Sequence, residues 1–199
     1  MKDQRRIAIF DVGGVLCRGV VRPKVRDLAR KYALDEKRMM EKARELRPCV
    51  DLGSIVEQEF WIRLLASQGV ACEPDDLELR SYAVPNPGIP EMFARIPTEE
   101  IRLAILSNDS IELFQTRAVA LGICDRLDVI VVSAAVGVKK PDPRIYDCVL
   151  DALEAPAESC FFVDDKPENV AAGREKGLDA HLFNSVRELE SQLGLNGAR

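Results

Sequence analysis

The sequence is poor in several features that mark particular protein classes. It has one histidine, His181, it has six cysteines without a CxxC pair, and its apolar runs fall short of the ~20 residues needed for a membrane-spanning helix. His181 lies on a predicted short edge strand far from the motifs described below, which excludes histidine-based catalysis. The scattered cysteines indicate reduced thiols in a cytoplasmic protein. The apolar run after "MKDQRR" is too short for a signal peptide. We therefore expect neither a membrane span nor a disulfide framework.

An excess of basic charge is also absent. The net charge is −5, so a nucleic-acid partner is not expected, although a local basic site can still hold an anion. Hydrophobic residues make up 47% of the 199 residues, which is enough for one core with an inserted lobe. We expect a monomer or a homodimer.

Apolar strands alternate with amphipathic helices along most of the chain. Strands are predicted at residues 7–12, 101–108, 127–136, 159–165 and 179–183. Residues 23–82 interrupt the alternation with helical spacing and little strand character, and three prolines within 84–90 end this block. Near-continuous apolar strands separated by helices predict a parallel sheet covered on both faces. The fold class is therefore α/β, a doubly wound parallel sheet with an all-helical insertion after its first strand.

Polar side chains follow the ends of these strands, where ligands bind in sheets of this kind. In chain order they are Asp11, Ser107, Asn108, Lys140, Asp164 and Asp165. A hydroxyl and helix-start amides can hold phosphate oxygens, a lysine neutralises developing charge, and carboxylates bind Mg²⁺ together with phosphate. These residues predict a site for an oxyanion and a divalent metal, in which Asp11 attacks phosphorus and forms an aspartyl phosphate.

Four segments resemble, in family order, the motifs of the haloacid dehalogenase-like (HAD) hydrolases. They are "DVGGV", "ILSND", "VKKPDPRIY" and "FFVDDKPEN", and the similarity covers nearly the whole chain. The stretch "DLGSIVEQEFW" resembles a segment frequent in the branch of glucose-1-phosphatase-like enzymes and the phosphatase domain of soluble epoxide hydrolases. The resemblance implies a Rossmann-like core of residues 1–16 and 85–199, with residues 17–84 as a small helical cap.

The resemblance also implies roles for individual residues. Asp11 is the nucleophile, Lys140 is the second catalytic residue, and both Ser107 and Asn108 bind the transferred group. The implied activity is that of a phosphoric monoester hydrolase acting on a small phosphorylated metabolite. Arg18, Arg22 and Arg47 are candidate contacts for an anionic substrate, although most arginines are simply solvated.

The metal implied by the resemblance is Mg²⁺. Its ligands are Asp11, Asp165 and the backbone carbonyl of Gly13, with Asp164 either near the metal or acting as the partner of Lys140. A backbone carbonyl needs no particular side chain, so glycine at position 13 does not remove this ligand.

Gly13 is nevertheless a departure, because phosphatases of this family normally carry Asp there. That carboxyl group protonates the leaving oxygen and then activates water, and losing such a group typically costs ~10²–10⁴-fold in rate. Three hypotheses remain. The first is a phosphatase that uses water, the cap or the substrate as acid and base. The second is a 2-haloacid dehalogenase, which the Asp164-Asp165 pair argues against. The third is a non-catalytic relative that binds a phosphorylated ligand or a protein.

Overall fold

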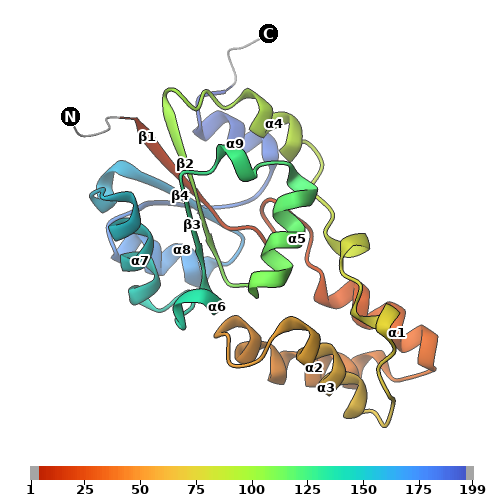
Figure 1. The fold of residues 1–199 in the computed structure, drawn as a ribbon. Helices are drawn as coiled ribbons and strands as arrows, with labels where there is room; N and C mark the ends of the chain where they lie inside the picture. Colours follow the sequence, from red (N-terminus) through yellow and green to blue (C-terminus); the bar gives the residue numbers. More distant parts are fainter. Residues whose placement is uncertain (1–4, 196–199) are drawn as a thin grey trace.

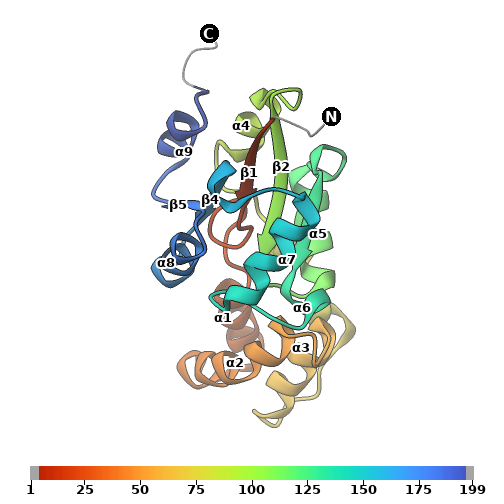
Figure 2. The ribbon, with the colours of Figure 1, turned by 90° about the vertical axis from the view of Figure 1, so that its left-hand side faces the viewer.

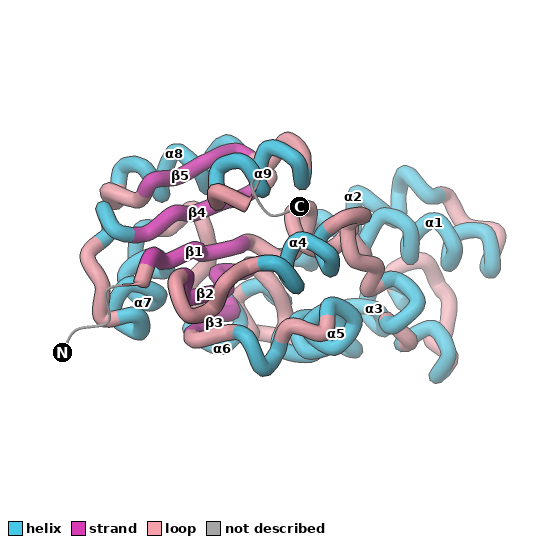
Figure 3. The backbone as a smooth tube through the Cα atoms, turned by 90° about the horizontal axis from the view of Figure 1, so that it is seen from above, coloured by secondary structure: helices cyan, strands magenta, loops and turns pink. Residues whose placement is uncertain are grey.

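The computed structural model describes residues 5–195, in which a five-stranded parallel sheet is flanked by helices (Figure 1). The strands are β1 (Arg6–Phe10), β2 (Ile101–Ser107), β3 (Val129–Val132), β4 (Cys160–Asp164) and β5 (Asp179–Leu182). Their order across the sheet is β3-β2-β1-β4-β5, which can be followed in Figure 3 and puts β1 in the centre. The predicted doubly wound α/β sheet is confirmed.

Each face of the sheet is covered by its own group of helices. One group is α4 (Ile89–Arg95), α5 (Ile111–Leu121) and α9 (Val186–Gln192), and the other is α7 (Pro143–Leu153) and α8 (Pro167–Glu175). Side chains alternate along β1: Ala8 and Phe10 pack on the first face, while Ile7 and Ile9 pack on the second. Because helices cover both faces of the sheet, the polar residues that follow the strands lie together at its carboxyl end.

The chain between β1 and β2 is helical, as predicted. It contains α1 (Val21–Tyr32), α2 (Glu36–Asp51), α3 (Glu57–Ala66) and the 3-10 turns η1 (Pro74–Leu77) and η2 (Arg80–Tyr82). These elements lie beyond the carboxyl end of the sheet (Figure 2). Their apolar core contains Phe60, Trp61 and Leu64, and Leu113 of α5 packs against it. That residues 17–84 form a separate cap domain stays a prediction.

The strand predicted at 127–136 is too long. It is preceded by the 3-10 turn η3 (Cys124–Arg126) and shortened to β3, and residues 133–136 form the helical turn α6 (Ser133–Val136). Gly137 ends that turn with φ 70°, and its backbone N–H donates to the carbonyl of Ser133. A short apolar run fits a strand and a buried helical turn equally well, so the pattern alone could not separate them. A further 3-10 turn, η4 (Ala157–Ser159), precedes β4.

Among residues 5–195, the longest helices are too short or too polar to cross a membrane. The six cysteines all lie in this range and all are free thiols, as expected from their spacing.

Candidate active site

The loop after β1 presents Asp11 at the carboxyl end of the central strand. The backbone N–H of Asp11 donates to the carbonyl of Val163 on β4, which ties the residue to the sheet. The chain then turns at Gly14, whose φ is +98°. A Cβ at Gly14 would lie 2.1 Å from Oδ2 of Asp165. Glycine is therefore required at position 14 by its backbone angle and by the close approach of this carboxylate.

Lys140 is the cation beneath Asp11. Its Nζ donates to Oδ1 of Asp11 at 2.8 Å, to Oδ2 of Asp164 at 2.6 Å and to the carbonyl of Leu106 at 2.5 Å. Burial acts to lower the pKa of Lys140, but the two carboxylates outweigh it and hold that pKa above its ordinary value. The ammonium therefore stays charged and fixes the orientation of both carboxylates.

Asn108 locks the loop that carries Lys140. Its amide Nδ2 donates to the Lys140 carbonyl, and its Oδ1 accepts from the Lys140 backbone N–H, each at 2.8 Å. Ser107, the last residue of β2, is buried, and its hydroxyl has no hydrogen-bond partner within the part of the chain that the structure describes. An unpaired buried hydroxyl at this edge of the sheet is free to donate to a bound oxyanion.

The two carboxylates at the carboxyl end of β4 have different surroundings. Asp164 is fully buried and accepts from Lys140, from the backbone N–H of Lys166 and from the Asn169 amide. Asp165 is exposed at the pocket, yet the protein packed around its carboxyl group and the charges of Asp11 and Asp164 raise its pKa to about 6. Asp164 is thus the partner of Lys140, whereas Lys166 and Lys140 offset the negative charge of Asp165 only in part.

A divalent cation fits this arrangement. Asp11, Asp164 and Asp165 each offer a carboxylate oxygen, and these oxygens lie within 4.8 Å of one another. Burial also raises the pKa of Asp11, an effect that the Asp164 charge strengthens and Lys140 opposes. Two of the three carboxylates pair with Lys140 and the third, Asp165, pairs with no described residue. Hard oxygen donors of this kind favour Mg²⁺.

A pocket of about 390 Å³ opens between this edge of the sheet and the helical segment. Asp11, Gly13, Asn108 and Asp165 are among the residues that line it, whereas Lys140, Asp164 and Ser107 are not. The strand-end residues identified from the sequence thus come together, some at the pocket wall and some behind it. Of the three arginines considered as substrate contacts, Arg22 and Arg47 line the pocket and Arg18 does not.

A second group of charges, which the sequence analysis missed, joins the helical segment to the sheet. This arginine–carboxylate cluster consists of Arg47, Asp51, Glu57, Asp109, Arg117 and Lys139. Arg47 of α2 donates to Asp51, to Glu57 and to Oδ1 of Asp109. Arg117 of α5 donates to the other oxygen of Asp109 at 2.5 Å. Asp109 is therefore one of the points where the helical segment and the core meet.

Glu57 is the most deeply enclosed acid on the helical side of this cluster. It is 1% exposed and accepts from Arg47, from the indole N–H of Trp61 and from the hydroxyl of Ser110. Ser110 also accepts from the backbone N–H of Leu113, so it caps α5. One signal was present in the sequence: Glu57 stands on the otherwise apolar face of α3 that carries Trp61.

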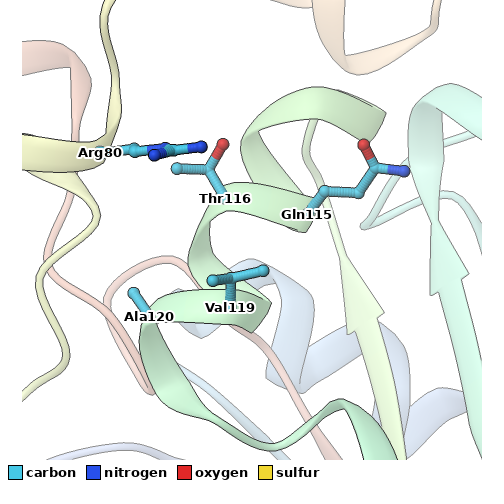
Figure 4. Close-up of a pocket in the computed structure, with 5 residues that line it drawn as sticks. All are labelled: Arg80, Gln115, Thr116, Val119 and Ala120. Atoms are coloured by element: carbon cyan, nitrogen blue, oxygen red, sulfur yellow. The ribbon is translucent and has the colours of Figure 1, made fainter.

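A separate hollow of about 480 Å³ lies on the outer side of α5. Figure 4 shows Arg80 extending from η2 toward Thr116, with Val119 and Ala120 further along α5. Its lining is mostly apolar and includes none of the strand-end residues, so the chemistry of the predicted site does not extend to it.

Comparison with known proteins agrees with this geometry. The model of the haloacid dehalogenase-like hydrolases matches residues 6–177. "Phosphatase MT3486" of Mycobacterium tuberculosis is 33% identical over 117 residues, which is 55% of this chain and 52% of that protein. A phosphoserine phosphatase of Thermus thermophilus is 31% identical over 81 residues, 40% of this chain and 32% of that protein. The chain thus matches about half the length of the first relative and less of the second.

Solved structures show the same fold at low sequence identity. A HAD family enzyme of Bacteroides thetaiotaomicron, crystallised with magnesium and inorganic phosphate, has a TM-score of 0.73 at 17% identity, covering 93% of this chain and 98% of that one. The L-2-haloacid dehalogenase of Xanthobacter autotrophicus has a TM-score of 0.68 at 19% identity, covering 98% and 84%. At such identities the likeness concerns the fold alone. The family model, in contrast, matches residues 6–177, which is most of the sequence. The chain therefore belongs to the haloacid dehalogenase-like hydrolases.

Proposed function

We propose that this hydrolase is a magnesium-dependent phosphatase that acts on a small phosphorylated metabolite. The observation that carries the proposal is the set of Asp11, Asp164 and Asp165 around the single ammonium of Lys140. This arrangement suits a ligand that brings a dianionic phosphoryl group together with a divalent cation. The phosphatase relatives support the same reaction class.

The residues divide the chemistry among themselves. Asp11 attacks phosphorus, its Oδ–P bond forms, and the bond to the ester oxygen breaks with its electron pair leaving on that oxygen. Lys140 holds Asp11 in place and offsets negative charge as the phosphoryl group transfers. Ser107 donates its unpaired hydroxyl to a phosphoryl oxygen. Water then attacks phosphorus, releasing phosphate and restoring Asp11.

The metal would be held by Asp11, by Asp165 and by the carbonyl of Gly13, with Asp164 engaged by Lys140 behind them. When bound, Mg²⁺ neutralises phosphoryl charge and orients the ester. Asp165 disfavours the dehalogenase hypothesis, because a carboxylate whose charge is offset only in part would repel both a halide and a carboxylate substrate.

The test is a screen of phosphate esters run beside a 2-chloropropionate assay, with wild-type protein and Asp11→Asn. We expect phosphate release that needs Mg²⁺ and falls on the order of 10⁴-fold in Asp11→Asn, because an amide is a poor nucleophile of the same shape. Asp142→Asn is the control, since that aspartate pairs with Arg144 at the surface. Halide release without phosphate release would assign the protein to the dehalogenases. If neither phosphate nor halide is released, the hypothesis of a non-catalytic binding protein is favoured.

A further inference from the structure

The space above Gly13 is filled by a guanidinium group. A Cβ built on Gly13 would lie 3.2 Å from Nη1 of Arg117 and 3.5 Å from its Nη2. Gly13 is not among the glycines with positive φ, so its backbone angles admit a side chain. The side chain that position 13 lacks is thus replaced in space by the end of Arg117, which reaches it from α5.

Arg117 is firmly placed there but incompletely bonded. It is 5% exposed and lines the pocket beside Asp11. Its Nη1 donates to Oδ2 of Asp109, whose other oxygen accepts from Arg47. Its buried Nε has no hydrogen-bond partner in the part of the chain that the structure describes. A buried donor without a partner costs free energy, so Asp109 does not satisfy the whole guanidinium group. The two Nη atoms of Arg117 are the ones that approach Gly13.

From this placement we propose that Arg117 stabilises the leaving-group oxygen by its positive charge, at the position where a carboxylic acid would otherwise protonate it. The inference rests on the proposed phosphatase function. As the phosphorus–oxygen bond breaks, its electron pair goes to the leaving oxygen, which departs as an anion beside Arg117. That anion then takes its proton from solvent water, and Arg117 keeps its own.

The proposal specifies the substrate class. A guanidinium group does not release a proton in proteins, so Arg117 helps only a leaving group that can depart as an anion. Phosphate esters of phenols, enols and anomeric hydroxyls meet this condition, and so do acyl phosphates. Simple alkyl phosphates do not, because an alkoxide requires a proton during bond breaking.

The experiment compares aryl phosphates of graded leaving-group acidity with wild-type protein, Arg117→Ala and Arg117→Lys. We expect kcat/KM of Arg117→Ala to fall about 10²-fold or more for phenyl phosphate and less than about tenfold for para-nitrophenyl phosphate, which needs little help. The dependence on leaving-group acidity therefore steepens. Arg117→Lys keeps the charge and should lie between the two.

Chemical rescue separates this electrostatic role from a structural one. Guanidinium chloride at low millimolar concentration should restore phenyl phosphate hydrolysis in Arg117→Ala, while ammonium chloride should restore less. Arg63→Ala serves as the control, because Arg63 is exposed on α3 and pairs with Glu59 of the same helix. Neither salt should alter the rates of that variant.

The outcomes are distinct. An unchanged dependence on leaving-group acidity in Arg117→Ala, in a protein that still hydrolyses esters, would overturn the inference and leave the phosphatase proposal standing. A uniform loss for all esters without rescue would also overturn it, assigning Arg117 a structural role. Absence of phosphate release by the wild-type protein would overturn the proposed function, and this inference with it.

Discussion

Two groups of charges contribute side chains to the pocket wall, and they are balanced differently. In the first, Asp11 and Asp164 share the ammonium group of Lys140, while the nearby Asp165 forms no ion pair with any described residue. In the arginine–carboxylate cluster, Arg47, Arg117 and Lys139 face Asp51, Glu57 and Asp109. The second group has as many positive as negative side chains and joins two parts of the chain, although the Nε of Arg117 has no partner among the described residues. The first carries excess negative charge, which folding alone would not favour and which a cationic ligand would offset.

Replacing the one cation of the unbalanced group should have the largest effect on stability. Lys140→Met leaves Asp11 and Asp164 buried without it, so we expect a loss of about 3–5 kcal/mol in the free energy of unfolding. Lys139→Met is a matched control, because that neighbouring lysine pairs with Asp51 near the surface and should cost less than about 1 kcal/mol. Urea titrations of both variants measure the difference. Equal losses would contradict the distinction between the two groups.

Removing one charge from the balanced group should also destabilise the protein. Glu57→Gln leaves Arg47 with less compensation and disturbs the bonds from Trp61 and Ser110, at a cost of about 2–4 kcal/mol. Glu59→Gln on the same helix should change stability by less than about 0.5 kcal/mol, since its pair with Arg63 is exposed. Thermal unfolding of the two variants makes the comparison. A stabilised Glu57→Gln would show that this group is not balanced.

Gly13→Asp tests the position where Arg117 of the arginine–carboxylate cluster approaches the loop that carries Asp11. The new carboxylate would stand against Arg117, which lies 3.2 Å from the added Cβ and would hold the new carboxyl pKa low. We expect a gain of less than about tenfold with alkyl phosphates, below the ~10²–10⁴-fold that an unhindered acid supplies. Combining it with Arg117→Gln should enlarge the gain. Gly13→Asn controls for size, and a full gain from Gly13→Asp alone would contradict the placement of Arg117.

Asp165→Asn should give the smallest effect on stability and the opposite sign. The pKa of Asp165 is raised from 3.8 to about 6, so the folded protein binds this proton more tightly than the unfolded chain does. Its contribution to stability therefore falls as pH rises from 3.8 to about 6, and the penalty persists at higher pH. At pH 7 in EDTA, Asp165→Asn should be more stable than wild type by about 1 kcal/mol, since solvent screens this exposed group.

Added Mg²⁺ should reverse that order, because binding to the native state stabilises wild type and much less the variant. Differential scanning calorimetry at pH 3.5 and pH 7, with and without Mg²⁺, separates the contributions. A variant less stable than wild type in EDTA at pH 7 would show that the Asp165 charge is already compensated.

Features that depend on neighbouring residues, such as most strands and helices, and the polar residues at strand ends could be predicted from the sequence. Asp11 and Asp164 lie at the carboxyl ends of apolar strands of a parallel sheet, and that topology alone brings their side chains to one edge. The sequence did not predict α6, because an apolar run of that length fits two backbone conformations. The ion pairs of the arginine–carboxylate cluster could not be predicted from the sequence for another reason. Arg47 and Asp109 meet only through the packing of α2 against the core, and their separation in sequence carries no periodic signal.

The helical segment enters and leaves the core at one place. Cys17 pairs with Pro85 across an isolated β-bridge, and the Asn86 amide donates to the carbonyls of Gly14 and Val15. The two connecting segments therefore hold each other at the edge of the core. Residues between them can be gained, lost or exchanged while these contacts keep Asp11 in its position on the sheet. Chains with the same junction can therefore inherit one reaction and diverge in what they recognise.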